Sequence, residues 1–215
     1  SEMSTYKIPA LSLTVIHQGE IEWAKIYVNA DFPEEQDLDC SSIFQAASLS
    51  KPVTFLAALR MHAAGEIDLD ENIQNYLEDY VIPEGKQTPE DPVTFRNIFA
   101  HTSGITPGGY QGYSKDLPIP SDLDILRGSA EANTPAIEVV NPPNETLAYS
   151  GGAYTLAELA LQDIYKDDFS NIMQKWILDP TGMEHSEFTQ PLPDSKSDQV
   201  AKGHTQSGEM IEGGW

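Results

Sequence analysis

The stretch Ser48-Leu49-Ser50-Lys51 stands where an apolar run meets a helix-forming stretch that ends at Gly65. Residues 43–60 read Ile-Phe-Gln-Ala-Ala-Ser-Leu-Ser-Lys-Pro-Val-Thr-Phe-Leu-Ala-Ala-Leu-Arg. This pattern predicts a helix that begins near Ser48, where free backbone N–H groups favour developing negative charge. Lys51 follows one turn later and lies beside Ser48. A serine hydroxyl next to an amine base is the minimum equipment for acyl transfer.

A Ser and a Lys three positions apart on a helix are, taken alone, most often a solvated surface pair. The context of Lys51 favours a functional reading, because apolar residues flank it on both sides. Its ammonium group is therefore expected to be partly desolvated, which favours the neutral amine that a base requires. A second pattern surrounds Tyr149, where a turn-rich entry leads to a glycine pair and an apolar helix. Tyr149 is either a proton shuttle or an aromatic plug.

Several segments together resemble the serine β-lactamase-like superfamily, in the branch that holds class C β-lactamases, D-alanyl-D-alanine carboxypeptidases, D-aminopeptidases and related esterases. The likeness runs through nearly the whole chain, and the matching segments occur in the same order and at similar spacing. They are the first strand at 8–16, the nucleophile helix at 48–51, and the segments 65–73, 93–104, 149–151 and 179–183.

The resemblance implies an α+β fold, an antiparallel sheet flanked by helices plus a mainly helical lobe, incomplete at the C-terminus. Residues 1–47 would supply N-terminal strands of the α/β lobe. Residues 48–215 would supply the nucleophile helix and the mainly helical lobe, so that the chain forms one incomplete catalytic unit.

The resemblance also implies a serine hydrolase that acts through an acyl-enzyme on esters or amides. Ser48 attacks a carbonyl, Lys51 and Tyr149 relay its proton, and the N–H of Ser48 contributes half of the oxyanion hole. Which of Lys51 and Tyr149 is the base stays open. The activity could be that of an esterase, a D-aminopeptidase, a carboxypeptidase or a weak β-lactamase. The alternative is a non-catalytic, penicillin-binding-like sensor or interaction module.

Two departures from the family pattern bear on the substrate. Active β-lactamases and peptidases of the family usually carry an asparagine two residues after the tyrosine, and here that place holds Gly151. The third motif of the family, a Lys-Thr-Gly or His-x-Gly strand, does not occur before the chain stops at Trp215, and Thr181-Gly182 follows a proline instead of a basic residue. Gly151 and Tyr110, the latter in an irregular loop over 106–120, are the predicted substrate-binding residues.

The missing motif predicts that this chain is a fragment trimmed on both sides, with a tag scar before Met3 as the competing reading of its start. We expect the 215-residue chain to be inactive alone. Its expected partners are a small ester, amide or peptide substrate and either a missing C-terminal segment or further copies of itself.

Composition excludes several classes of partner. The chain has 12 Lys and Arg against 34 Asp and Glu, a formal net charge of −22, so nucleic acids and anionic membranes would be repelled. No apolar run approaches the roughly 20 residues that span a bilayer, and no signal peptide is visible. Localisation stays open, although the resemblance favours a periplasmic or secreted protein. The single cysteine, Cys40, excludes an internal disulfide and is expected to be a partly buried structural thiol.

No metal or cofactor is expected. The five histidines are scattered without H-x-H or HExxH spacing, and His101 is expected to hold a turn by hydrogen bonding. Residues 68–79 begin like a calcium loop but carry Ile73 where glycine is required and Asp79 where glutamate is required. No glycine-rich phosphate loop is present.

The remaining patterns predict the elements around the site. Alternating apolar and polar residues predict a hairpin over 11–28 that turns at Gln18-Gly19-Glu20. Residues 1–7 read as the last turn of a helix. Further helices are predicted at 69–77, 94–100, 122–128, 153–165 and 169–178.

Overall fold

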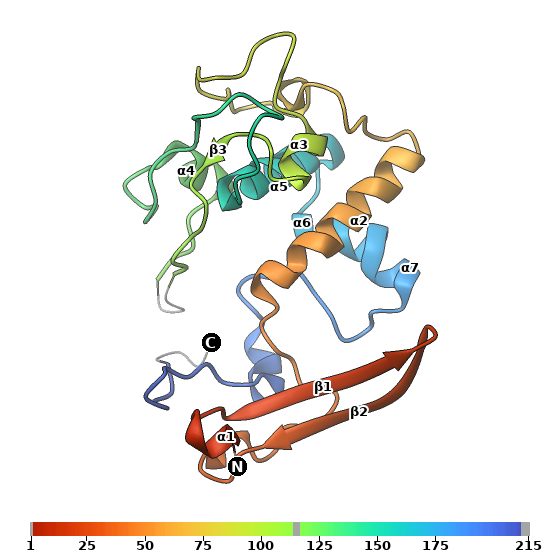
Figure 1. Ribbon diagram of the computed structural model, residues 1–215, viewed down its shortest axis with the longest axis vertical. Coiled ribbons are helices and arrows are strands. Elements are labelled where there is room, and N and C mark those ends of the chain that lie inside the picture. The colour runs from red at the N-terminus through yellow and green to blue at the C-terminus, as the bar shows by residue number, and fades with distance from the viewer. Residues whose placement is uncertain (1, 114–116, 212–215) are drawn as a thin grey trace. The chain divides into compact units, whose positions relative to one another are not determined.

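The computed structural model describes residues 2–113 and 117–211 (Figure 1). They fall into two compact units. The hairpin unit comprises Ser1–Ala47, Ser114–Leu117 and Thr189–Trp215, and the helical unit comprises Ser48–Tyr113 and Pro118–Phe188. This grouping has a boundary between 47 and 48 and joins the C-terminal segment to the first part of the chain. The division into 1–47 and 48–215 stays a prediction for the catalytic unit.

The hairpin unit is built on two antiparallel strands, β1 (Ala10–His17) and β2 (Glu20–Val28), preceded by the short helix α1 (Glu2–Thr5). The strands pair from Ala10 opposite Val28 to His17 opposite Glu20, with one register shift between Val15 and Ile16. Gln18 and Gly19 form the two-residue turn with φ of 51° and 83°. Two positive φ values match the twist of the strands that they join. The predicted hairpin and the predicted helical turn before it are therefore confirmed.

The rest of the hairpin unit joins residues that are far apart in the sequence. The short 3₁₀ helices η1 (Pro33–Glu35) and η5 (Asp194–Gln199) belong to it, and Ile43 pairs with Val200 in a parallel bridge. Glu35 is 1% exposed and accepts a hydrogen bond from the backbone N–H of Lys202 at 2.9 Å. Cys40 is exposed in a turn, so the expectation of a partly buried thiol was wrong.

The helical unit begins at Ser48, within the single 3₁₀ turn η2 (Ala47–Leu49), which runs directly into α2 (Ser50–Ala63). The other elements of this unit follow in chain order: η3 (Ile73–Tyr76), α3 (Phe95–Phe99), β3 (Ile105–Thr106), α4 (Asp122–Arg127), β4 (Glu138–Val139), α5 (Gly151–Tyr165), α6 (Phe169–Met173), the π-helical turn η4 (Gln174–Leu178) and α7 (Asp179–Thr181). The helices predicted at 94–100, 122–128, 153–165 and 169–178 are confirmed within one to two residues at most ends. The helix predicted at 69–77 is only one 3₁₀ turn.

The core of the helical unit lies along α5, which is apolar over much of its surface. Side chains of α2, α3 and α5 meet there with neighbours from the loops, and the largest fully buried ones are Phe95, Met61, Leu69, Ile73, Ile98, Leu126, Ile137, Leu156, Leu161, Met173, Ile177 and Leu178. Phe95 and Phe99 stack with their ring centroids 5.9 Å apart. Burial of these side chains fixes α5 and α2 in one unit.

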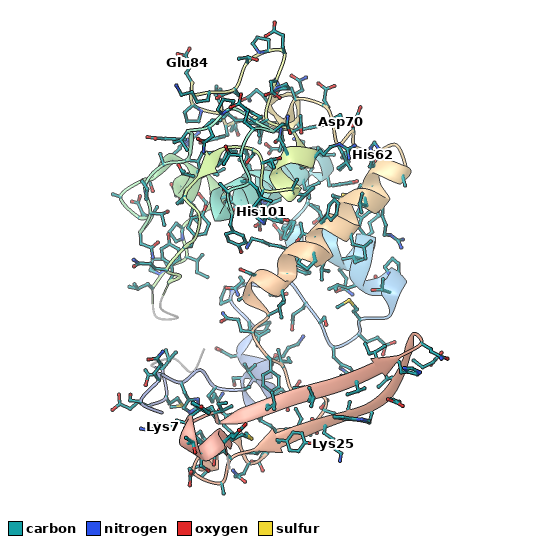
Figure 2. The ribbon with its side chains drawn as sticks, in the orientation of Figure 1. Lys7, Lys25, His62, Asp70, Glu84 and His101 are labelled. Carbon is teal, nitrogen blue, oxygen red and sulfur yellow. The ribbon has the colours of Figure 1, made fainter. Side chains whose placement is uncertain are left out.

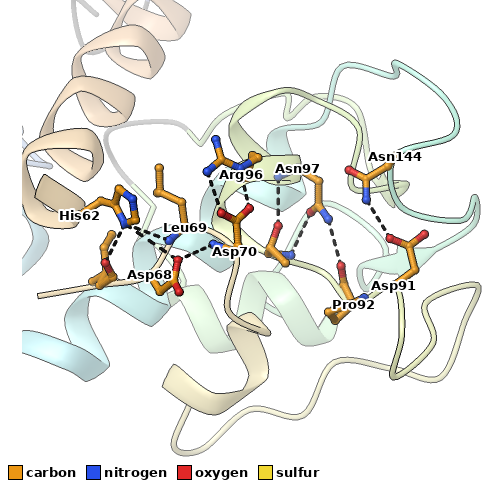
Figure 3. A network of polar contacts seen from close by, with 11 residues as sticks. His62, Asp68, Leu69, Asp70, Asp91, Pro92, Arg96, Asn97 and Asn144 are labelled. Carbon is orange, nitrogen blue, oxygen red and sulfur yellow. Dashed lines mark hydrogen bonds and ion pairs between the residues drawn. The ribbon is translucent and has the colours of Figure 1, made fainter. Parts of the chain in front are cut away.

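A polar network ties the loops before and after α3 together (Figure 3). Thr94 and Asn97 form a capping box, in which each side chain accepts from the backbone N–H of the other. Arg96 makes a bidentate pair with Asp70, with Nε–Oδ1 at 2.5 Å and an amino group 2.8 Å from Oδ2. The side chain of Asn144 donates to Asp91 at 2.8 Å. These bonds fix the start of α3 and thereby the turn at His101 that follows it.

In the part of the chain that the structure describes, no helix is long and apolar enough to cross a membrane, and no group of three His, Cys, Asp or Glu residues could hold a metal ion. Residues 114–116 of the predicted loop over 106–120, and the last residues from 212 onward, lie outside the described residues.

Candidate active site

Ser48 lies in the 3₁₀ turn that opens into α2, with an exposed side chain. Ala47 before it has a φ of 45°, in the left-handed region that residues with a Cβ rarely adopt. Pro52 stands in the first turn of α2, where its missing N–H has no partner to lose. The local sequence therefore presents the Ser48 hydroxyl at a helix start, beside backbone N–H groups that the helix leaves free.

Lys51 reaches back toward Ser48. Its Nζ donates to Ser48 Oγ at 3.3 Å. The same Nζ lies 5.0 Å from the ring centroid of Tyr149 and 5.2 Å from that of Tyr154. Both rings attract a cation through their π faces.

Tyr149 brings a second hydroxyl to Ser48. Its Oη lies 2.7 Å from Ser48 Oγ and donates to it. The hydrogen bond with Lys51, and after it the bond with Ser48, hold the pKa of the Tyr149 phenol below its usual value of 10.0. Residues 101 positions apart in the chain, Ser48 and Tyr149, thus meet at one oxygen, together with Lys51.

His101 and Tyr154 complete the surroundings of these three side chains. The ring of His101 lies 4.5 Å from that of Tyr149 and 5.4 Å from that of Tyr154, centroid to centroid. His101 accepts a hydrogen bond from the backbone N–H of Ser150 at Nδ1, which confirms that it holds a turn by hydrogen bonding. Figure 2 labels His101 among the side chains of the helical unit. Tyr154 was not singled out in the sequence, although it stands just after the glycine pair that follows Tyr149.

Gly151 and Tyr110, the predicted substrate-binding residues, lie against each other. A Cβ at Gly151 would stand 3.2 Å from Cε2 of Tyr110 and 3.3 Å from the carbonyl oxygen of Gly108. The Tyr110 hydroxyl accepts from Thr155 Oγ1 at 3.1 Å, and burial raises the pKa of this phenol. Among the described residues, neither Gly151 nor Tyr110 makes a polar contact with the side chains of Ser48, Lys51 or Tyr149. The role of Gly151 and Tyr110 in substrate binding stays a prediction.

The sequence was compared with protein families and with curated proteins. A family model described as Beta-lactamase matches residues 1–212. Protein flp of Staphylococcus aureus (strain N315) is 24% identical over 202 residues, which covers 90% of this chain and 37% of flp. Penicillin-binding protein 4* of Bacillus subtilis (strain 168) is 24% identical over 194 residues, which covers 86% of this chain and 40% of that protein. The chain therefore spans well under half the length of these relatives.

Solved structures show the same fold. The beta-lactamase/D-alanine carboxypeptidase from Yersinia pestis, complexed with citrate, superposes with a TM-score of 0.70 at 18% identity, over 92% of this chain and 54% of that one. The octameric penicillin-binding protein homologue from Pyrococcus abyssi superposes with a TM-score of 0.66 at 22% identity, over 98% of this chain and 47% of that one. The predicted fold class and the predicted resemblance are confirmed, and with the match over residues 1–212 the chain belongs to the beta-lactamase family.

Proposed function

We propose that this chain carries the nucleophile of a serine hydrolase that acts through an acyl-enzyme on small esters or amides. One observation carries the proposal: the Oγ of Ser48 is contacted by Lys51 Nζ at 3.3 Å and by Tyr149 Oη at 2.7 Å. The lowered pKa of the Tyr149 phenol places a group that can act as a base within hydrogen-bond distance of the Ser48 hydroxyl. Family membership supports the same reaction class, because the family contains serine hydrolases.

Tyr149, in this proposal, is the base and Lys51 is its electrostatic partner. The Tyr149 contact to Ser48 Oγ is the shorter of the two, and the Lys51 ammonium group lies over the aromatic rings of Tyr149 and Tyr154. When Tyr149 is deprotonated, the 2.7 Å contact reverses its direction and Ser48 donates to the phenolate. The ammonium group of Lys51 stabilises that phenolate.

The reaction then runs in two steps. Ser48 Oγ attacks the carbonyl carbon while its proton passes to Tyr149, and the backbone N–H of Ser48 donates to the oxygen that becomes negative. As the tetrahedral intermediate collapses, Tyr149 returns the proton to the leaving alcohol or amine, and the acyl group stays on Ser48. In the second step, water attacks the acyl carbon and gives a proton to Tyr149. As this second tetrahedral intermediate collapses, the bond between the acyl carbon and Ser48 Oγ breaks, Tyr149 returns the proton to Ser48 Oγ, and the acid is released.

Covalent labelling tests the proposal in the full-length protein. We expect a fluorophosphonate or a penicillin to add its mass to the wild-type protein and not to the Ser48→Ala variant. The matched control is Ser50→Ala, which removes a hydroxyl two positions away, at the first residue of α2. Labelling of Ser48→Ala at the wild-type rate would exclude Ser48 as the nucleophile. The absence of labelling in the wild type by either probe would favour a non-catalytic binding module.

We also propose that the full-length protein is a homo-oligomer. The Pyrococcus abyssi homologue is octameric, and its fold matches 98% of this chain. The mass of the full-length protein in solution, measured by light scattering, tests this, and a monomeric mass would contradict it.

A further inference from the structure

His101 holds the backbone on both sides of Tyr149. Its carbonyl oxygen accepts the N–H of Ala148 at 2.8 Å, and its Nδ1 accepts the N–H of Ser150 at 3.2 Å. One residue thus anchors the peptide groups immediately before and after the tyrosine. His101 itself has a φ of 57°, a left-handed conformation that turns its side chain and its carbonyl toward the same segment.

The imidazole ring also supports the side chain of Tyr149. The ring centroids of His101 and Tyr149 are 4.5 Å apart with planes inclined by 33°. Tyr149 is 49% exposed, so few other contacts restrict its ring. Because the hydroxyl must stay near Ser48 Oγ, a displacement of this ring by about 1 Å is enough to cost on the order of 10²-fold in rate.

The contact with Ser150 requires one protonation state of His101. A backbone N–H only donates, so Nδ1 must be unprotonated and the proton of the neutral ring lies on Nε2. Burial, and after it the charge of Lys51, lower the pKa of His101 below its usual value of 6.5. The titratable groups that face the ring are Lys51 of α2, Tyr149 of the segment before α5, and Tyr154 of α5. Protonation of Nδ1 would bring its N–H against the backbone N–H of Ser150, so the hydrogen bond would be lost. It would also add a second positive charge near Lys51.

We propose that His101 is a positioning residue, which holds the Tyr149 hydroxyl at Ser48 while its imidazole is neutral and releases it when the imidazole is protonated. This inference rests on the proposed function, because it assigns His101 a part in the same reaction. His101 does not touch the reacting atoms and acts through Tyr149 alone.

Two variants of the full-length protein separate the parts of this role. His101→Asn places Oδ1 where His101 has Nδ1, so it keeps the acceptor for Ser150, tolerates the left-handed backbone and does not titrate. His101→Phe keeps a flat ring against Tyr149 but has a carbon in place of the acceptor. The measurements are kcat and KM for p-nitrophenyl acetate from pH 5 to pH 9, with thermal unfolding of each variant at every pH.

We expect His101→Phe to lose on the order of 10- to 100-fold in kcat with KM within about twofold, and His101→Asn to recover kcat to within about threefold of wild type. In wild type the fall of kcat/KM should steepen below pH 6.5, where a free imidazole titrates. The kcat/KM profile of His101→Asn should lack this steepening. It should keep the change in kcat/KM at higher pH that the titration of Tyr149 causes.

The same steepening in His101→Asn, or a wild-type kcat in His101→Phe, would overturn the inference. If His101→Phe does not fold, the pH profile of His101→Asn decides alone. An active Ser48→Ala variant would instead overturn the proposed function. If Ser48→Ala is inactive but both His101 variants have the activity of wild type, only the positioning role is removed. A readout without activity is the ¹⁵N NMR spectrum of the His101 ring at pH 7.5: the Nε2–H tautomer supports the inference and the Nδ1–H tautomer contradicts it.

Discussion

Lys51 lies over two phenol rings, an arrangement that bears on the proposed roles of Lys51 and Tyr149. Its Nζ is 5.0 Å from the ring of Tyr149 and 5.2 Å from the ring of Tyr154. A cation in this place is stabilised by about 0.5–2 kcal/mol, depending on how far it is desolvated. Loss of the Tyr149 proton would create an ion pair between the phenolate and the Lys51 ammonium group. This arrangement supports the proposal that Tyr149 is the acid and base of the reaction.

Tyr149→Phe tests this assignment. The change removes one exposed hydroxyl and no ring, so we expect the acylation rate to fall by about 10²- to 10⁴-fold, the usual contribution of a general base. The melting temperature should stay within about 2 °C, because exposed positions contribute little to stability. The rate of acylation by a fluorophosphonate and a thermal unfolding curve measure both quantities.

Tyr165→Phe is the matched control, since Tyr165 lies on α5 with a buried hydroxyl for which the described structure shows no hydrogen-bond partner. It should acylate at the wild-type rate. A fully active Tyr149→Phe variant, whether stable or destabilised, would contradict the role of Tyr149 as a base and would support a purely structural role as an aromatic plug.

Gly104 connects α3 to β3, and the neighbouring chain passes so close that no side chain fits. It has a φ of 73°, and a Cβ there would stand 2.0 Å from the carbonyl oxygen of Asn141. Gly65, after α2, has nearly the same φ of 77° but nothing within 4 Å of the added Cβ. An alanine at either position has to adopt the same unfavourable left-handed backbone conformation. The two positions differ only in the space available for its Cβ.

We therefore expect Gly65→Ala to lower the free energy of unfolding by about 1–2 kcal/mol, from the left-handed backbone alone. Gly104→Ala should lose about 1–3 kcal/mol more, because the backbone at Asn141 must move. Urea unfolding of the two variants measures the difference. An equal loss of unfolding free energy in the two variants would show that the backbone at Asn141 can move away from the new Cβ at no cost.

The contact of α4 with α5 contains two carboxyl groups. Burial, and after it the charge of Asp122, raise the pKa of Glu158 to about 8, and Asp122 accepts from Gln162 at 2.6 Å. A carboxyl whose pKa is higher in the folded state binds more protons when folded. Its contribution to stability is therefore present at low pH and is lost as the pH rises from 4.5, the usual value for glutamate, to about 8.

Glu158→Gln should remove this loss. We expect wild type to lose more stability between pH 5 and pH 8 than the variant does, in urea unfolding at both pH values. Glu145→Gln, at an exposed position, is the control and should follow wild type. A Glu158→Gln variant with the same pH dependence as wild type would contradict the raised pKa.

The substrate preference of the proposed hydrolase is predicted from Gly151. By the resemblance, Gly151 stands where active β-lactamases and peptidases usually carry an asparagine that contacts the substrate amide, and a Cβ at this position would lie 3.2 Å from Cε2 of Tyr110. Without that amide contact, we expect kcat/KM of the full-length protein to be higher for p-nitrophenyl acetate than for nitrocefin. Gly151→Asn should not restore nitrocefin hydrolysis, because its side chain meets the Tyr110 ring. A clear nitrocefin preference in wild type would contradict this account.

Local patterns predicted much of this molecule. The turn at Gln18-Gly19 and the helices at 94–100 and 153–165 are each set by neighbours in the sequence, and each was predicted from it. Ser48 and Lys51 are also close in sequence, and Tyr149 was found through its own segment. Their meeting is a contact across 101 positions, which only the likeness to a family could suggest.

What the sequence did not predict depends on side chains from distant segments. The helix predicted over 69–77 shrinks to η3 because the Gln74 side chain bonds the backbone groups of Tyr80 and Ile82, which holds the chain in an extended exit. The place of Tyr154 at Lys51 depends on how α5 packs near α2. The bridge from Ile43 to Val200 leaves no local pattern at all.

A second contact of the same kind, the hydrogen bond from the Lys202 backbone to Glu35, limits the order in which the chain can fold during synthesis. Glu35 and Lys202 are separated by 167 positions, and the whole helical unit is encoded between them. At about 5–20 residues per second, roughly 8–33 s pass after Glu35 is made before its partner exists. Glu35 therefore cannot form its contact with Lys202 until the helical unit has been translated in full.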